Sequence, residues 1–456
     1  MKGKGKIKII VAVACIIGIA LLSWSIASTL AKPDYIALGL AEYEAGNYEK
    51  AVEFFTKAIK QDPNNAVAYY NRGLAYSEIG KKKRIDPNEK AIADFTKAIE
   101  LNPNFIDAYY NRGLLYCGLG HSGIHHYHKL PTEPWPPEIE ERYKKALADF
   151  NKCLELDPNY ALAHAGKGNL FYKYYDSYED MKKAIAEYNK ALEGADFILQ
   201  KAGKKGLAGV YYSRGRAHTY MGLWDKAESD YLKAIELDPN CRIALGHLAH
   251  LYIDLERYPE ALELCARYEK AAGGATVHSL DFKGTAYYHL GEYDKAIKAF
   301  EELAASSRWP TMTLKAYRYL GMIYQAKGDK EKAEEYYKKA IDLATKIIAE
   351  GEKQISTQVA IAYYHRGLVY AELKEYERSI QDLSKVIELK VASDREYGHE
   401  NYYIKSHIAL GKIYSKIGEK EKAKEYFERA LELLQRPGSP EPIKKKVEKL
   451  LKNLIG

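Results

Sequence analysis

A pattern of glycine, alanine, aromatic and proline residues recurs along most of this chain and restricts its fold more than any other feature. In its first copy the pattern consists of Tyr35, Leu38, Gly39, Gly46, Tyr48, Ala51, Phe55, Ala58 and Pro63. Small residues at Gly39 and Ala51 allow two antiparallel helices to approach closely, Gly46 ends the first helix, and Pro63 follows the second. The pattern therefore predicts a helical hairpin.

Nine further copies follow, each marked by a small residue in the first helix and an Ala or Ser in the second. These pairs are Gly73 and Ala91, Gly113 and Ala146, Gly168 and Ala184, Gly215 and Ala227, Ala249 and Ala261, Gly284 and Ala296, Gly321 and Ala333, Gly367 and Ser379, and Gly411 and Ala423. Together the ten copies span residues 32–436. Because a repeat array buries its core between neighbouring copies, its length alone does not divide it into globular domains.

The repeated pattern resembles the tetratricopeptide repeat. This resemblance implies an all-α fold in which about ten hairpins stack into a right-handed α-solenoid. It also implies that the first helices line a concave groove, which holds an extended peptide or a partner helix. The chain contains no nucleophile elbow, phosphate-binding loop or HExxH motif, so we expect no enzyme.

An uncharged segment, residues 9–31, precedes the repeats and is long enough to cross a bilayer. Lys2, Lys4, Lys6 and Lys8 stand before it without an acidic residue, and this bias predicts a cytoplasmic start. We therefore expect residues 1–31 to form a signal-anchor with one transmembrane helix, and the repeats to lie on the extracytoplasmic side. A cleaved signal peptide, which would leave the chain exported and soluble, is the alternative.

The charged residues argue against a nucleic-acid partner. The chain has 69 Lys and Arg residues and 62 Asp and Glu residues, and four of the lysines belong to the amino-terminal cluster. The repeats are therefore nearly neutral, whereas affinity for nucleic acid depends mainly on a concentrated basic surface. We expect a protein or peptide partner, and a membrane contact through the N-terminal helix.

Departures from the repeat period predict loops at residues 81–88, 119–142 and 194–206. After Arg436, a proline-rich linker precedes a lysine-rich segment with one apolar face, formed by Ile443, Val447, Leu450, Leu451 and Leu454. Because a solenoid needs a terminal cap with a polar outer side, residues 437–456 predict a linker and a capping helix. Contact between its lysines and anionic lipid is the alternative.

One cluster of metal-ligating residue types lies at the third-copy insertion: Cys117, His121, His125, His126 and His128. His121 and His125 are four residues apart, so one helical turn could direct both at a single zinc or copper ion. The neighbouring glycines and prolines favour a surface loop instead. We expect no cofactor unless this insertion binds zinc or copper.

First-helix residues that hairpin packing does not use are candidates for partner contacts. In the first three copies they are Ile36, Leu40, Tyr43, Tyr70, Asn71, Leu74, Tyr110, Asn111 and Leu114. Asn71 and Asn111 resemble the asparagine ladder with which some repeat families hold a peptide backbone, and their amides are expected to bond a ligand when one is present. The alternative is that both are solvated groove residues. A chaperone-tail carboxylate clamp would carry Lys and Asn in place of Ile36 and Leu40, so we expect no chaperone-tail receptor. The later copies predict a basic groove through Lys315, Arg318, Lys405, Lys412 and Lys416.

Two positions vary together among the copies. The first position directly precedes the small residue of the first helix, and the second lies three residues after the Ala or Ser of the second helix. Where the first position holds Arg or Lys, the second is acidic, except in the copy with Lys283. Where the first position holds Leu, the second is apolar or aromatic. A guanidinium that meets a carboxylate between packed helices fixes their register. The covariation predicts structural ion pairs in five hairpins: Arg72 with Asp94, Arg112 with Asp149, Lys167 with Glu187, Arg214 with Asp230, and Arg366 with Asp382.

Together these features predict a membrane-anchored interaction scaffold that takes part in envelope assembly, secretion or polysaccharide machinery. A metal-handling or enzyme-accessory protein centred on the histidine-rich insertion is the alternative.

Overall fold

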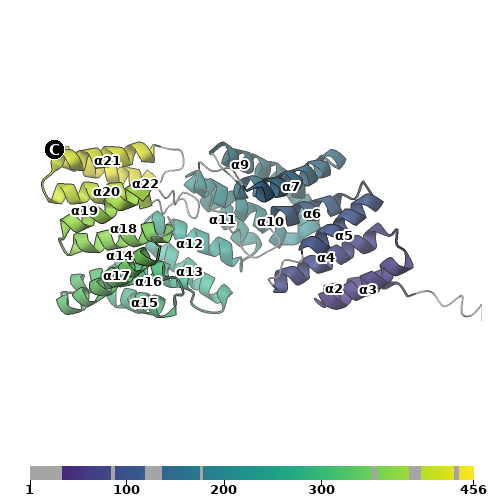
Figure 1. Ribbon diagram of the computed structural model, residues 1–456, viewed down its shortest axis with the longest axis horizontal. Coiled ribbons are helices and arrows are strands. Elements are labelled where there is room, and N and C mark those ends of the chain that lie inside the picture. The colour runs from purple at the N-terminus through teal and green to yellow at the C-terminus, as the bar shows by residue number, and fades with distance from the viewer. Residues whose placement is uncertain are drawn as a thin grey trace, which may run out of the picture. The chain divides into compact units, whose positions relative to one another are not determined.

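The structure is a computed structural model that describes residues 33–83, 88–118, 136–174, 178–351, 357–389, 402–435 and 441–455. These residues form 21 helices and no strands (Figure 1). The helices belong to two compact units, Met1–Gly123 and Ile124–Gly456, which are described separately. The first unit contains α2 to α6, and the second contains α7 to α22.

The helices alternate between first and second members of the predicted hairpins. The first helices are α2 (Tyr35–Glu44), α4 (Ala66–Lys83), α6 (Ile106–Cys117), α8 (Ala161–Lys173), α10 (Ala195–Tyr220), α12 (Arg242–Asp254), α14 (Val277–His289), α16 (Pro310–Ala326), α18 (Thr357–Glu372) and α20 (Tyr402–Lys416). The second helices are α3 (Tyr48–Gln61), α5 (Asn88–Leu101), α7 (Pro137–Leu156), α9 (Tyr178–Glu193), α11 (Trp224–Leu237), α13 (Tyr258–Ala272), α15 (Tyr293–Ser306), α17 (Lys330–Gly351), α19 (Tyr376–Leu389) and α21 (Lys420–Leu434). A last helix, α22 (Glu441–Ile455), follows them.

The first helices from α12 to α20 form a continuous layer in the second unit. Helix α12 packs on α14, α14 on α16, α16 on α18, and α18 on α20, in addition to the packing of each on its hairpin partner. The second helices of successive hairpins make no comparable contacts among the described residues. Because neighbouring elements lie closer together on the inside of a curved array, this difference places the first helices on the concave side.

Glycines in the first helices allow the two helices of a hairpin to approach. A Cβ atom built on Gly39 would lie 2.5 Å from the Phe55 ring, and one built on Gly321 would lie 2.5 Å from the Tyr337 ring. Since real Cβ atoms do not approach other atoms so closely, the aromatic ring of the second helix occupies the space that any side chain would need. This contact explains why glycine and an aromatic residue recur at fixed spacing.

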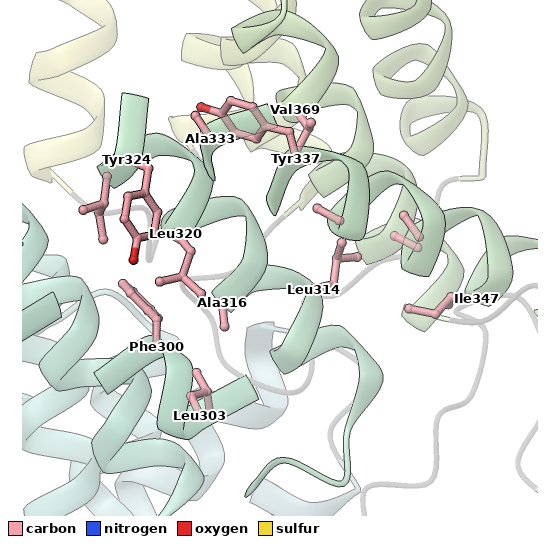
Figure 2. Close-up of a cluster of buried hydrophobic side chains, with 14 of the residues drawn as sticks. Phe300, Leu303, Leu314, Ala316, Leu320, Tyr324, Ala333, Tyr337, Ile347 and Val369 are labelled. Carbon is pink, nitrogen blue, oxygen red and sulfur yellow. The ribbon is translucent and has the colours of Figure 1, made fainter. Parts of the chain in front are cut away.

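The core is a series of buried clusters between consecutive helices. In the cluster drawn in Figure 2, Phe300 and Leu303 of α15 lie beside Leu320 and Ala316 of α16, with Tyr337 of α17 close by. All five side chains are buried. Each hairpin therefore completes its core only by packing on the next one, as a repeat array requires.

Left-handed backbone geometry ends most first helices. Gly46, which follows α2, has a φ of +78°, and Gly328 after α16 has a φ of +83°. Glycine tolerates these values because it has no Cβ atom. In two hairpins the same place is taken by residues with a side chain, Glu256 with a φ of 59° and Lys374 with a φ of 62°.

The carboxy-terminal helix α22 packs on α21. Its contacts come from the predicted apolar face, on which Val447 is buried and Ile443, Leu450, Leu451 and Leu454 are packed around it. The cluster includes Phe427 of α21. Helix α22 therefore covers the apolar side of the last hairpin.

All three predicted loops are partly helical in the structure, and α4 already runs to Lys83 in the first of them. Helix α10 begins at Ala195 and runs through most of the expected interruption, with Gly203 as its one non-helical residue (φ 67°, ψ −176°). Helix α7 already begins at Pro137, inside the predicted 119–142 loop. The reason is burial of apolar side chains, because Ile198 and Ile139 both enter the core.

No helix in the described part of the chain combines the length and the apolar character needed to cross a bilayer. The predicted signal-anchor, residues 1–31, lies outside the described residues.

Candidate functional site

Tyr70 and Asn111, two of the predicted partner-binding residues, contact each other across α4 and α6. The Asn111 amide nitrogen donates to the Tyr70 hydroxyl at 3.1 Å and to the backbone carbonyl of Asp107 at 2.8 Å. The Tyr70 ring packs 4.7 Å from the Phe105 ring, and burial raises the pKa of its hydroxyl. The amide nitrogen of Asn111 thus links two first helices in this structure, and partner contact through Asn111 stays a prediction.

The other candidates of the first three copies differ in how far they reach solvent. Leu40 is exposed, whereas the Asn71 side chain is buried. The remaining six are half-buried: Ile36, Tyr43, Tyr70, Leu74, Tyr110 and Leu114. Burial, followed by the charge of Glu78, raises the pKa of Tyr43 to about 12. Partner contact by these residues stays a prediction.

The second unit contains a cavity of about 700 Å³ in its first-helix layer. Its walls come from α12, α14, α16 and α18, and Tyr268 of α13 and Tyr402 of α20 complete them. Side chains with rings dominate the lining: His247, His250, Tyr268, His278, Phe282, Trp309, His365 and Tyr402. A concave, mainly apolar site with a few polar groups is the usual form of a ligand-binding site.

Asp281 and Lys315 form an ion pair in the wall of this cavity. The Lys315 ammonium donates to Asp281 Oδ2 at 2.8 Å. The other carboxylate oxygen, Asp281 Oδ1, is buried and has no hydrogen-bond partner among the described residues. Nearby, burial lowers the pKa of His278, which keeps that ring neutral at pH 7.

Two of the five predicted groove cations contact neighbouring first helices in the structure. Lys315 is neutralised by Asp281, which stands on the preceding first helix α14. The Arg318 guanidinium donates from Nε to Nδ1 of His365 on the next first helix, at 3.1 Å. Both cations are therefore held by neighbouring first helices, because stacked repeats place side chains of adjacent copies in contact.

Sequence reasoning missed Asp281, although one signal was available. Asp281 lies three residues before the first-helix glycine Gly284, and the other nine copies have no acidic residue at this position. They carry Ile36, Tyr70, Tyr110, Ala165, Tyr212, Gly246, Arg318, Tyr364 and Ile408 there. An acidic residue at a position that is otherwise almost always uncharged distinguishes this copy from the others.

Four of the five predicted ion pairs lie together in the structure. Arg72 donates to Asp94 through two hydrogen bonds of 2.8 and 2.7 Å, and Arg366 to Asp382 through two of 2.7 and 2.8 Å. Two further pairs have nitrogen to oxygen distances of 2.6 Å and 3.3 Å: Arg214 with Asp230 and Lys167 with Glu187. Arg112 and Asp149 belong to different units, so their pairing stays a prediction.

The guanidinium groups also reach a third helix, which the covariation did not indicate. Arg72 Nη1 donates to Thr56 at 3.2 Å, and Arg366 Nη1 donates to Thr345 at 2.9 Å. Arg112 Nη1 contacts Thr96 in the same way, at 3.0 Å. Each of these acceptors lies on the second helix of the preceding hairpin. One arginine thus links successive hairpins as well as the helices of its own hairpin.

The predicted metal ligands His121, His125, His126 and His128 lie outside the described residues. Cys117 is described, and its side chain is buried at the end of α6. Elsewhere in the described part of the chain, no group of three or more His, Cys, Asp and Glu side chains is arranged to hold a metal ion.

Family models of the tetratricopeptide repeat match more than half of the chain. A model described as TPR repeat matches residues 39–80 and 88–120. Models described as tetratricopeptide repeat match residues 138–160, 208–241, 275–346 and 358–436. The segments 275–346 and 358–436 each cover two helical hairpins of the structure, α14 to α17 and α18 to α21.

The chain is also similar to curated proteins and solved structures. It is 24% identical to a protein CTR9 homolog of Arabidopsis thaliana, over 68% of this chain and 29% of that protein. It is 23% identical to DnaJ homolog subfamily C member 7 of Mus musculus, over 86% of this chain and 65% of that protein. It therefore spans less than two thirds of either relative. The solved structure of yeast Tom70 is similar over 92% of this chain and 95% of the Tom70 chain, with 16% sequence identity and a TM-score of 0.37. Because the family models match its repeats over more than half of its length, the chain belongs to the tetratricopeptide repeat family.

Proposed function

We propose that this protein is a membrane-anchored scaffold that binds an extended segment of a partner protein on its concave first-helix layer. Proteins of this family act as protein–protein interaction scaffolds. The observation that carries the proposal is the cavity of about 700 Å³ on that layer. The proposal includes a right-handed solenoid around the groove, and a role in envelope assembly, secretion or polysaccharide machinery.

The shape and lining of the cavity support partner binding. The Trp309 side chain is half exposed, with 50% of its surface open to solvent, although it stands among other rings. Large aromatic side chains at the centre of a concave surface contribute most of the binding energy in many interfaces. Exposure of such a side chain costs free energy in the unbound protein, and a partner that covers it removes this cost.

A site-specific photo-crosslinker tests this function. We would place it at Thr311, which lines the cavity, and in a matched variant at Lys385, an exposed residue of the second helix α19. The proposal expects one partner protein to be crosslinked in cells from Thr311 and not from Lys385. Equal crosslinking from both positions, or none from Thr311, would contradict binding on the first-helix layer.

The membrane part of the proposal depends on residues 1–31. The uncharged segment and the four lysines before it support a signal-anchor with the repeats on the extracytoplasmic side. Protease added to cells with a permeabilised outer layer should digest the repeats while a cytoplasmic control protein stays intact. Full protection of the repeats would reverse the proposed topology.

We retain metal handling as a second proposal, because the histidine spacing at residues 121–128 suits zinc or copper. Cys117 is buried at the end of α6, so this proposal relies on the four histidines. Deletion of residues 121–128 should abolish zinc or copper uptake by the purified chain if this proposal is correct. A scaffold would bind no metal with or without these residues.

A further inference from the structure

Three lysine side chains come together where α22 packs on α20. Lys412 and Lys416 are about one turn apart on α20 and therefore share one face of that helix. Val447 of α22 is buried in a cluster against which Ile408 of α20 also packs. Lys446 directly precedes Val447, and its charge acts on the Lys412 ammonium. Lys412, Lys416 and Lys446 thus form a lysine cluster that spans two helices.

Lys412 and Lys416 make no ion pair with a carboxylate among the described residues. Partial burial of the Lys412 ammonium, followed by the charges of Lys446 and Lys416, lowers its pKa. All three side chains are nevertheless exposed to solvent, so a ligand has access to them. Because like charges repel strongly in a partly desolvated place, an anion bound between these ammonium groups would relieve the repulsion.

The one carboxylate that contacts the lysine cluster in the described part of the chain belongs to Glu256. It lies in the turn between α12 and α13, and its Oε1 is 3.3 Å from the Lys446 ammonium. The side chains of Lys446 and Glu256 are 63% and 59% exposed, so this ion pair contributes little to stability. A bound anion could therefore replace Glu256 as the counter-charge of Lys446.

The backbone of Glu256 supports a role beyond folding. Its φ is 59°, whereas Gly418 occupies the equivalent turn of the last hairpin with a φ of 87°. A residue with a side chain costs free energy in this left-handed region, and such residues cluster at ligand sites and switches. The Glu256 carboxylate holds Lys446 from the other side of the array, which glycine could not do.

The two lysines of α20 are also specific to the last copy of the repeat. They stand one and five residues after the small residue of the first helix. The ninth copy carries Leu368 and Glu372 at these positions, and no other copy has a lysine or arginine at both. Hairpin packing therefore does not require this pair of lysines.

The number of ammonium groups indicates which anion fits. A terminal phosphate group carries a charge of about −1.5 to −2 at pH 7 and has three acceptor oxygens. It can accept a hydrogen bond from each of the three lysines, and lysine binds phosphate as a point charge. A carboxylate has one charge and two oxygens, so it would leave one ammonium without an acceptor oxygen of its own.

We propose that Lys412, Lys416 and Lys446 bind a terminal phosphate group, either of a soluble phosphate compound or of a lipid headgroup. On binding, the phosphate replaces Glu256 beside Lys446. The proposal goes beyond the scaffold function, and it depends neither on the identity of a partner protein nor on the membrane topology.

The test measures binding of inorganic pyrophosphate to the purified full chain in a non-ionic detergent, by calorimetry at constant ionic strength. The variants are Lys412→Met, Lys412→Arg and Glu256→Gln, with Lys424→Met as the matched control. Lys424 is a partly exposed lysine of the same hairpin, on α21, and lies 3.9 Å from Glu428. Dimethyl phosphate, a monoanion with two free oxygens, serves as a second probe.

We expect the Kd of pyrophosphate to rise at least about tenfold in Lys412→Met, because one charged hydrogen bond is lost. Lys412→Arg keeps the charge and should bind within about threefold of the wild type, as should Lys424→Met. Glu256→Gln should lower the Kd, because no carboxylate then competes for Lys446. Dimethyl phosphate should bind the wild-type chain much more weakly than pyrophosphate. Lys412→Met removes an ammonium without a counter-charge, so its melting temperature should not fall.

Three results would overturn the proposal: no saturable binding of pyrophosphate, equal losses in Lys412→Met and Lys424→Met, or equally tight binding of dimethyl phosphate. If Lys412→Met does not fold, Glu256→Gln and dimethyl phosphate decide the question. Competition by glycerol phosphate and by short-chain phosphatidic acid then identifies the source of the phosphate. Much stronger competition by phosphatidic acid would support a lipid headgroup, and equal competition would support a soluble compound.

Discussion

Arg366 and Asp382 meet through two parallel hydrogen bonds, from Nε at 2.7 Å and from Nη2 at 2.8 Å, and join the two helices of one hairpin. The carboxylate is 6% exposed and the guanidinium side chain 16% exposed. In other hairpins the same two positions hold Leu410 with Tyr426, or Leu320 with Tyr336. The chain therefore uses two alternative solutions, ionic and apolar, for the same place in the fold.

The first prediction compares Arg366→Leu with the double variant Arg366→Leu and Asp382→Tyr. The single change leaves the buried Asp382 without its cation, and such losses cost about 3–5 kcal/mol. The double change reproduces the apolar pair of the last hairpin, so it should recover most of this free energy. Urea denaturation followed by circular dichroism measures both. A double variant no more stable than the single variant would show that the two positions do not compensate.

The second prediction concerns the glycines that face aromatic rings. Gly321→Ala places a Cβ atom 2.5 Å from the Tyr337 ring, whereas Gly367→Ala places one 3.0 Å from the more adaptable Leu383 side chain. Overpacking of this kind costs about 1–3 kcal/mol. We expect Gly321→Ala to lower the free energy of unfolding clearly more than Gly367→Ala. Equal losses would mean that the ring contact does not determine the need for glycine.

The third prediction uses the turn between α18 and α19. Lys374 has a φ of 62°, and a side chain costs about 1–2 kcal/mol in this left-handed region. Lys374→Gly should therefore raise the melting temperature, although glycine also increases the entropy of the unfolded chain. The reverse change, Gly328→Lys at the equivalent turn, should lower it. Changes of the same sign in both variants would contradict the argument.

The sequence predicts the hairpins well, because the residues that define them act locally. Gly321 and Tyr337 lie in one hairpin, and Gly46 determines its own turn, so the spacing along the chain contains the information. The cavity could not be predicted in this way. His278, Asp281 and Trp309 come together with Arg242 and His365 from several copies, and their distances depend on how the hairpins stack. The periodic pattern is the same whatever that stacking angle is, so it cannot indicate which copies surround a cavity.

The last prediction is that His407 makes the last hairpin sensitive to acid. Its ring packs between Tyr403 and Tyr426, at centroid distances of 4.9 and 5.6 Å. Neither ring nitrogen has a hydrogen-bond partner in the part of the chain that the structure describes. Burial, together with the positive charge of Arg429, lowers the pKa of His407 from 6.5 to about 4.

The sign of the effect follows from proton uptake. Between pH 6.5 and pH 4 the unfolded chain protonates His407 and the folded chain does not, so the free energy of unfolding falls as the pH falls through this range. The loss from this residue amounts to roughly 2–3 kcal/mol.

His407→Phe keeps an aromatic ring and removes the titration, so the variant should lose less stability than the wild type between pH 6.5 and pH 4. Urea midpoints at both ends of this range measure the difference. His289→Phe serves as a control at a more exposed histidine of α14. Partial burial lowers the pKa of His289 as well, so its loss should flatten the profile without abolishing the His407 contribution. Parallel profiles for the wild type and His407→Phe would show that the His407 pKa is not lowered in the folded chain.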